Sequence, residues 1–513
     1  MATADSHEAP ASLTAAAVRG SVLNTGQWVA NKVATAAAML LIARMLRPEE
    51  YGVATQALAI AQFLVVLTPV SVGDVLIAHP SRLEMLAPSA RALALRVGLA
   101  MAGVVLVSIP VVVTAYSRYP ALALGGLVAL LSIRPVLDAL TVVPVSRLRV
   151  GLHYRRIALV DGVVQLAMTG VSLAMAAFGG RGASLVAPQL IGTGVRALVY
   201  GRSAADRPGA RVHGWAIRIL WRSLLPAALA QYVHNVVVLL EILVLGLVSG
   251  ELQTGLFGFA FLLAAQANGV IAYQLAVVLQ PIFGRLQDDP ARQRAGFLRA
   301  QRALAALCIP LSVTQAVVAE PLFRAAFDPR WEQAVPVFQA ISLGQTFYFA
   351  SSASISCLRA QRRFATFFRW QCIQGVLSIP LYVAGAYLGG AIGVAIASGI
   401  GWGIGSPCGV WLCLRGSGRR SVADAVLVFA RPWAATAIPA VGGWMIVREL
   451  GPCGIVGDLV TVVGVGALVL GSSVALAASI DPEVRGLLVP RLRKLLVSLA
   501  AKVGIRASGS RPS

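Results

Sequence analysis

Apolar residues are arranged in long runs along the whole chain, and short polar connections separate these runs. Within 274–340, one apolar run ends near Phe283, an arginine-rich connection follows, and a second apolar run fills 303–319. A helix of about 20 apolar residues is long enough to cross ~30 Å of hydrocarbon. The repeated pattern therefore predicts an all-α polytopic membrane protein.

About fourteen such runs can be placed, and each predicts one transmembrane helix. They lie near 22–44, 54–78, 93–116, 121–143, 157–178, 183–200, 223–248, 255–283, 303–319, 333–357, 366–388, 390–414, 425–447 and 455–479. The distribution of charge between them predicts the topology, because positively charged connections stay in the cytoplasm. If the N-terminus lies inside, the outer connections and the span ends beside them hold only seven of the 43 Lys and Arg residues. These seven are Arg44, Arg47, Arg118, Arg181, Arg324, Arg330 and Arg448. We therefore expect both termini to be cytoplasmic.

The spans fall into a predicted order of segments. A cytoplasmic N-tail (1–20) precedes an N-terminal lobe of six spans (21–200), a basic linker (201–222) and a C-terminal lobe of six spans (223–414). Two extra spans (415–480) and a basic cytoplasmic tail (481–513) follow. In the tail, leucines at helical spacing alternate with Arg and Lys from Pro490 onward, which favours an amphipathic helix on the anionic inner leaflet or, alternatively, a helix that docks on a partner.

Composition narrows the class further. The chain is 58% hydrophobic and only 12% charged, with a formal net charge of +22. Because the excess charge sits in short connections between spans, it indicates topology and attraction to anionic lipid rather than binding of nucleic acid. The six cysteines show neither CxxC nor Cys/His ligand spacing, and no nucleotide-binding glycine motif is present. We therefore expect no metal, no cofactor and no enzyme activity.

Several short motifs resemble those of a known family. Residues 43–52 (ARMLRPEEYG) resemble the ARxLxPxEYG turn of bacterial polysaccharide transporters, and 255–260 (GLFGFA) match the GxYxxA opening of their second half. Residues 281–290 (PIFGRLQDDP) are similar to their PxxxxLQxD loop, and 319–322 (AEPL) and 329–331 (PRW) match further positions. The chain thus resembles the O-antigen and exopolysaccharide flippases of the multidrug/oligosaccharidyl-lipid/polysaccharide exporter superfamily.

This resemblance implies a fold and a substrate. Two six-helix lobes would enclose a central cavity that opens alternately to each side of the bacterial inner membrane. The cargo would be an undecaprenyl-diphosphate-linked oligosaccharide, with a polysaccharide polymerase and chain-length machinery as possible partners. A drug or cation antiporter and a lipid II flippase of the same superfamily are the alternatives, and a membrane-embedded polymerase is a remote one.

Charged residues at bilayer depth are the candidates for binding the diphosphate, because they cost about 2.5–3.5 kcal/mol each to insert and usually face a bundle interior or water. Lys32 lies mid-span beside Gln27 and Asn31, which we expect to contact sugar. Arg134 is the second diphosphate candidate, and Asp138 lies one turn further along, so the two can form a structural ion pair instead.

The remaining candidates are single polar residues within spans. Glu241 can bind Na⁺ or exchange a proton, as can Asp138, which would couple transport to an ion gradient. Gln266, Asn268 and Gln345 are candidate sugar contacts. For all of these, hydrogen bonding between helices is the alternative interpretation.

Overall fold

The computed structural model describes residues 37–77, 80–151, 153–203, 212–286, 289–361, 363–415 and 420–486. Within these ranges every regular element is a helix, which confirms the all-α class. Two compact units are present. The first runs through Gly258 and includes Ala386–Ala391, and the second comprises Phe259–Gly385 and the chain from Ile392 onward.

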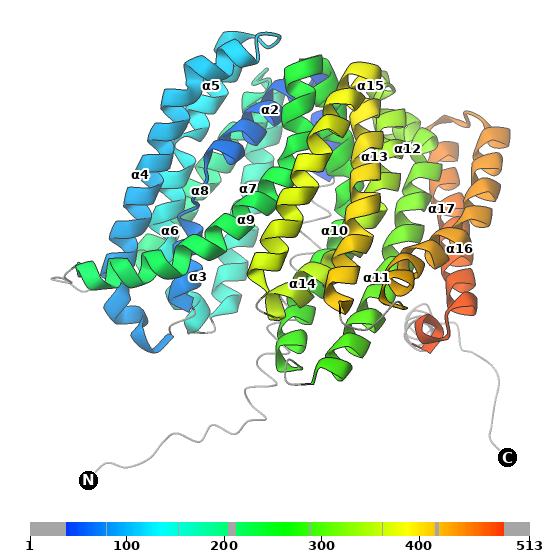
Figure 1. Cartoon of the computed structure of the whole chain (residues 1–513). Helices are drawn as coiled ribbons and strands as arrows, with labels where there is room; N and C mark the ends of the chain where they lie inside the picture. The colour runs from blue at the N-terminus through cyan, green and yellow to red at the C-terminus, as the bar shows by residue number, and fades with distance from the viewer. Residues whose placement is uncertain are drawn as a thin grey trace, which may run out of the picture. The chain divides into compact units, whose positions relative to one another are not determined.

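The first unit holds residues 37–45, which are helical, and then eight helices, one 3₁₀ turn and the start of a further helix. These are α2 (Pro48–Leu64), α3 (Val70–Ile77), the 3₁₀ turn η1 (Pro80–Arg82), α4 (Leu83–Ala115), α5 (Ala121–Leu131), α6 (Arg134–Val150), α7 (Tyr154–Ala177), α8 (Ala183–Ser203), α9 (Gly214–Ser249) and the first turns of α10 (Glu251–Arg285). In this unit α4 packs on α5 and α6, and α6 packs on α8 (Figure 1).

Two apolar cores hold the first unit together. One joins α2, α4, α5, α8 and α9 through side chains such as Ile60, Val105 and Val128. The other joins α3, α4, α6 and α9 through Leu76, Leu86 and further aliphatic residues. Since both cores include α9, this helix belongs to the first unit, although the predicted lobe boundary lay before it, at 201–222. The predicted domain limits themselves stay predictions.

The second unit continues with the rest of α10, seven further helices and one 3₁₀ turn, except that Ala386–Ala391 of α15 belongs to the first unit. These are α11 (Pro290–Val317), α12 (Ala319–Ala326), the 3₁₀ turn η2 (Pro329–Trp331), α13 (Ala334–Ala350), α14 (Ser352–Ala360), α15 (Phe364–Leu414), α16 (Arg420–Leu450) and α17 (Gly454–Ile480). Around η2 the ring of Phe259 packs on the fully buried Trp331, and the rings of Phe323 and Phe327 pack on Phe259 and on each other. The PRW motif thus forms an aromatic core.

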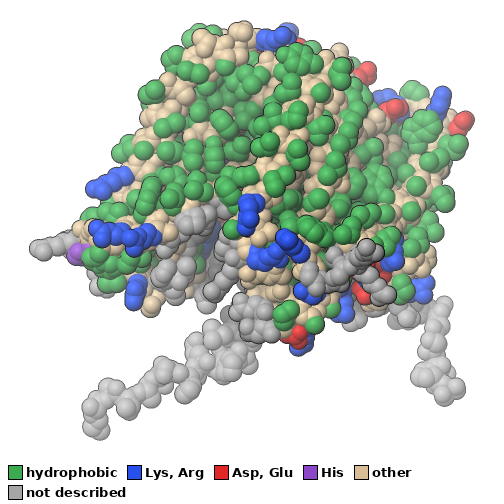
Figure 2. All heavy atoms as spheres, in the orientation of Figure 1, with side chains coloured by type: hydrophobic (Ala, Val, Ile, Leu, Met, Phe, Trp, Pro, Cys, Tyr) green, Lys and Arg blue, Asp and Glu red, His purple; other side chains and the backbone are tan. Residues whose placement is uncertain are grey.

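Seven helices among the described residues are long and apolar enough to cross a membrane, or eight if the bent pair α11–α12 counts as one. One of the seven, α15, is interrupted by non-helical backbone at Gly389 and Gly390, where the predicted boundary between two spans lies. Figure 2 shows hydrophobic side chains over the outward faces of the helices, with many Lys and Arg side chains toward helix ends. Val107 is 80% exposed, as expected for a side chain that faces lipid. The count of fourteen spans stays a prediction.

Some helix limits differ from the predicted ones. The apolar run 54–78 is not one helix, because α2 ends at Leu64 and α3 begins only at Val70. Pro69 explains the break, since it lacks an N–H group and disfavours helix at the residue before it. α9 begins at Gly214, inside the predicted linker, because Ala216, Leu220 and Leu224 are buried in the core of the first unit.

Candidate functional site

The first unit contains a cavity of about 260 Å³ with both polar and apolar walls. It is lined by Leu58, Ala61, Gln62, Val65, Val66, Thr68, Pro69, Ser71, Leu131, Arg134, Pro135, Asp138, Ala228, Gln231, Tyr232 and Asn235. These residues come from the end of α2, the break before α3, the junction of α5 and α6, and the middle of α9. The cavity therefore brings together three stretches that are far apart in sequence, 58–71, 131–138 and 228–235.

One wall of the cavity is an interruption between two apolar helices. Residues 65–69 separate α2 from α3, whereas Ser132 and Ile133, between α5 and α6, keep helical backbone angles. Irregular backbone at membrane depth is tolerated where it is buried in protein or lines a hydrated cavity, because its polar groups need partners. At the α2–α3 interruption the hydroxyls of Thr68 and Ser71 lie 2.8 Å apart. The arrangement matches a hydrated chamber.

Arg134 and Asp138 form an ion pair in this cavity. Arg134 is the first residue of α6, and its Nε lies 3.8 Å from Oδ2 of Asp138, one turn further on. The side chains are 40% and 29% exposed. A pair at this distance and exposure is weak, and a guanidinium has five donors, so Arg134 can bind a second anion without leaving Asp138.

The middle of α9 supplies uncharged polar groups to the same cavity. Gln231 donates from Nε2 to Oδ1 of Asn235 at 2.8 Å, and the hydroxyl of Tyr232 donates to the carbonyl of Phe63 at 2.8 Å. The second bond joins α9 to the last turn of α2, directly before the break. Amides and a phenol are suitable for binding sugar hydroxyls. None of these three residues was predicted from the sequence.

The predicted site residues fall into three groups. Arg134 and Asp138 meet in the cavity, whereas Lys32, Asn31 and Gln27 lie outside the described residues. Glu241, further along α9, is 2% exposed and does not line the cavity. Its side chain is buried between the helices of the first unit.

The predicted sugar contacts lie in the second unit. Asn268 is fully buried and donates from Nδ2 to Oγ of Ser312 at 2.8 Å and to Oε1 of Gln315 at 3.2 Å. Gln345 is also buried, and neither of its amide atoms has a hydrogen-bond partner among the described residues. Gln266, on α10, is half-buried. Their roles in sugar binding stay predictions.

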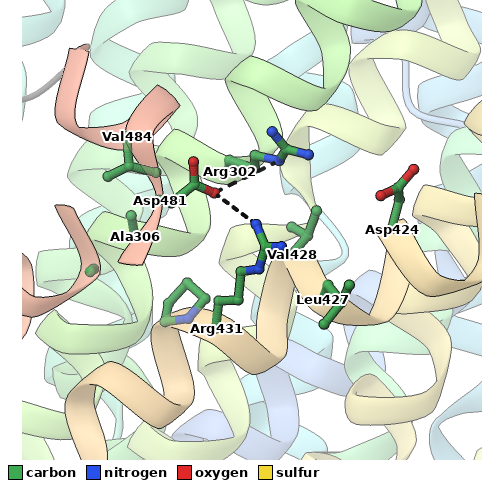
Figure 3. A pocket seen from close by; sticks show the side chains of 10 residues that line it. Arg302, Ala306, Asp424, Leu427, Val428, Arg431, Asp481 and Val484 are labelled. Atoms are coloured by element: carbon green, nitrogen blue, oxygen red, sulfur yellow. Dashed lines mark ion pairs between the residues drawn. The ribbon is translucent and has the colours of Figure 1, made fainter. Parts of the chain in front are cut away.

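A second, much smaller cavity lies in the second unit, where α17 ends (Figure 3). Its volume of about 20 Å³ is enough for a single water molecule. Asp481 is paired there with Arg302 at 3.9 Å and with Arg431 at 3.5 Å, and Arg302 also binds Glu483 at 2.8 Å. Because these charges are paired with one another, the cluster connects α11, α16 and the end of α17.

Comparison with known proteins gives the family. A sequence profile for the family described as "Polysaccharide biosynthesis protein" matches residues 41–336, more than half of the chain. The chain belongs to this family. The relationship that the motifs predicted is thereby confirmed.

Two curated relatives in polysaccharide pathways are similar over part of the chain. The lipopolysaccharide biosynthesis protein WzxC of Escherichia coli K12 is 26% identical over 157 residues, which cover 31% of this chain and 32% of that protein. The succinoglycan biosynthesis transport protein ExoT of Rhizobium meliloti is 24% identical over 165 residues, or 32% and 31% of the two chains. The matched segment thus spans about a third of the length of each relative.

Solved structures of membrane transporters share the fold of this family member. A lipid II flippase, MurJ, in an inward closed conformation matches with a TM-score of 0.70 and 14% identity, over 89% of this chain and 99% of that one. An inward-facing multidrug resistance transporter of the MATE family, in the MOP superfamily, matches with a TM-score of 0.60 and 12% identity, over 77% and 95%. At these identities the likeness shows the fold. The chain is therefore a multi-pass membrane protein with the transporter fold of that superfamily.

Proposed function

We propose that this protein is a flippase that moves an undecaprenyl-diphosphate-linked oligosaccharide from the cytoplasmic to the outer leaflet of the bacterial inner membrane. The product would serve exopolysaccharide, capsule or O-antigen synthesis. Membership of the polysaccharide biosynthesis family, the transporter fold, and the pathways named for WzxC and ExoT support this proposal. Movement would occur by alternating access.

The observation that carries the proposal is Arg134 in the polar cavity of the first unit. An anionic headgroup that crosses hydrocarbon needs a fixed cation and hydrogen-bond donors to replace water. Arg134 supplies the cation, and Gln231, Asn235 and Tyr232 supply uncharged groups. The cavity volume of about 260 Å³ is slightly below the ~300 Å³ of the smallest ordinary ligand pockets. We therefore expect the cavity to hold the diphosphate and one adjoining sugar rather than the whole oligosaccharide. The polyprenyl tail would stay in lipid.

Asp138 gives this site a means of coupling to ions. When a phosphate binds Arg134, it competes with Asp138 for the guanidinium, and proton uptake by the carboxylate would then favour binding. Glu241, buried on α9, is the second candidate for H⁺ or Na⁺ exchange. Lys32, outside the described residues, is proposed to share the diphosphate with Arg134.

The test is complementation of a deletion strain with the wild type, Arg134→Gln and Arg134→Lys. The matched control is Arg181→Gln, because the side chain of Arg181 is 82% exposed and lies outside the cavity. We expect Arg134→Gln to abolish surface polysaccharide and to accumulate cytoplasm-facing lipid-linked intermediates at normal protein levels. Arg134→Lys should retain part of the export, and the control all of it.

Three results would contradict the proposal. Full export by Arg134→Gln would remove the cavity from the transport path. Normal polysaccharide with altered drug tolerance in the deletion strain would favour the antiporter alternative. Loss of peptidoglycan precursor export would favour a lipid II flippase.

A further inference from the structure

The first two turns of α9 present an exposed face of aromatic and basic side chains. Trp215 and Trp221 are 45% and 38% exposed, and Arg218 and Arg222 are also exposed. These turns are fixed in place, because Ala216, Leu220 and Leu224 on the opposite side are buried against α3 and α4. The start of the helix is held as well, since His213 donates its backbone N–H to Oγ of Ser89, on α4, at 3.0 Å.

The two arginines of this face have no acidic partner in the described part of the chain. No salt bridge joins either guanidinium to a described carboxylate, and α9 carries no Asp or Glu before Glu241. Arg218 and Arg222 are four residues apart, so they lie on one side of the helix with their Cβ atoms about 6 Å apart. Two unpaired guanidinium groups at this spacing can bind both phosphates of one diphosphate.

The same helix leads from this face to the cavity. A single helical stripe with 4-3-4-3 spacing runs along α9 through Trp221, Leu225, Ala228, Tyr232 and Asn235. The last three of these residues line the cavity. Gln231 lies nine positions after Arg222 on α9, a rise of about 14 Å. α9 has 36 residues and is thus about 54 Å long, well over the ~30 Å of hydrocarbon, so its first turns extend to the membrane surface.

We infer that Trp215, Arg218, Trp221 and Arg222 form a docking site for the diphosphate of the lipid-linked substrate at the membrane surface, before it enters the cavity. This inference rests on the proposed function. Tryptophan is suited to the headgroup level of a bilayer, where its ring is in contact with lipid and its N–H with water. The paired arginines favour a diphosphate over the single phosphate of an ordinary phospholipid.

The experiment compares Arg218→Gln/Arg222→Gln with Arg155→Gln/Arg156→Gln, a control pair that removes the same charge from the exposed start of α7. Binding of undecaprenyl diphosphate and of phosphatidylglycerol is measured on purified protein in nanodiscs. We expect the α9 pair to weaken undecaprenyl diphosphate binding roughly tenfold or more, with little change for phosphatidylglycerol. Arg218→Lys/Arg222→Lys should recover part of the binding, and the control pair should bind as the wild type does.

Transport kinetics provide a second readout. In proteoliposomes the α9 pair should raise KM with kcat nearly unchanged, whereas Arg134→Gln should lower kcat, because only the cavity residue holds the headgroup during the crossing. Unchanged undecaprenyl diphosphate binding by the α9 pair would overturn the inference. An equal loss of phosphatidylglycerol binding would also overturn it, by showing a general lipid contact. Failure of the wild type to move lipid-linked oligosaccharide in proteoliposomes would refute the proposed function. The nanodisc comparison of undecaprenyl diphosphate binding would still test the docking site by itself.

Discussion

Two glycines allow α2 and α10 to cross closely in the first unit. A Cβ atom on Gly52 would collide with the carbonyl oxygen of Glu251 and lie 2.8 Å from the backbone nitrogen of Gly255. A Cβ atom on Gly255 would collide with the carbonyl oxygen of Pro48 and lie 3.1 Å from the nitrogen of Gly52. Both glycines belong to motifs that the sequence singled out, and the structure brings them together.

The cost of Gly52→Ala follows from this geometry. The obstacles are backbone atoms, which cannot rotate away, so the helices must separate by about 1 Å to restore contacts of ordinary length. Overpacking of this kind costs about 1–3 kcal/mol, and the upper end applies here. Alanine stabilises a helix by about 0.5–1 kcal/mol relative to glycine, which offsets part of this cost. The net loss of unfolding free energy is thus about 2 kcal/mol, or roughly 4–8 °C in melting temperature for a unit of this size.

Gly126→Ala is the matched control, because among the described residues no atom outside its own turn of α5 lies within 4 Å of the position that its Cβ would take. We expect its melting temperature in detergent to equal or exceed that of the wild type. The double variant Gly52→Ala/Gly255→Ala should lose less than the sum of the single variants, because both act on one crossing. If Gly52→Ala melted at or above Gly126→Ala, the close crossing would be refuted.

Three further outcomes are expected. Burial and the nearby Glu49 raise the pKa of Glu251, so the wild type should lose stability as pH rises through that pKa. Glu251→Gln should therefore melt at a higher temperature than the wild type at about pH 8 and at the same temperature at about pH 4. Equal melting temperatures at both pH values would contradict this. Arg324→Gln leaves the carboxylate of Asp458, whose side chain is 4% exposed, without its partner at 3.1 Å, and should lower the free energy of unfolding by about 3 kcal/mol. The double variant Arg324→Leu/Asp458→Leu should recover most of that stability, and a greater loss in the double variant would be the opposing result. Tyr232→Phe removes the bond to the carbonyl at the end of α2 and should lower export several-fold at normal protein levels, with unchanged export as the contrary result.

The sequence was sufficient for the helices and insufficient for their interruptions. Long apolar runs predict membrane helices directly, and the glycines at 389–390 marked the break inside α15. The break after Leu64 was missed because the residues around it are as apolar as those before it, so hydropathy does not change there. The start of α9 was missed because Arg218 and Arg222 suggested a loop, although the opposite side of the same turns is apolar.

The cavity was predicted in part, for a related reason. Arg134 and Asp138 stand out because charge is rare within an apolar run. Gln231 and Asn235 have the same i,i+4 spacing as Gln27 and Asn31, which was the available signal. Uncharged amides also form ordinary bonds between helices, so only the packing of α9 beside the α5–α6 junction identifies this pair as part of a cavity.

The ion pairs at the two ends of α17 have a practical consequence. Asp458 binds α12 through Arg324 near the start of the helix, and Asp481 binds α11 and α16 through Arg302 and Arg431 just past its end. These ion pairs join α17 to α11, α12 and α16 within the second unit. A fluorophore attached beside Ile480 would therefore report on the part of the second unit that these ion pairs connect.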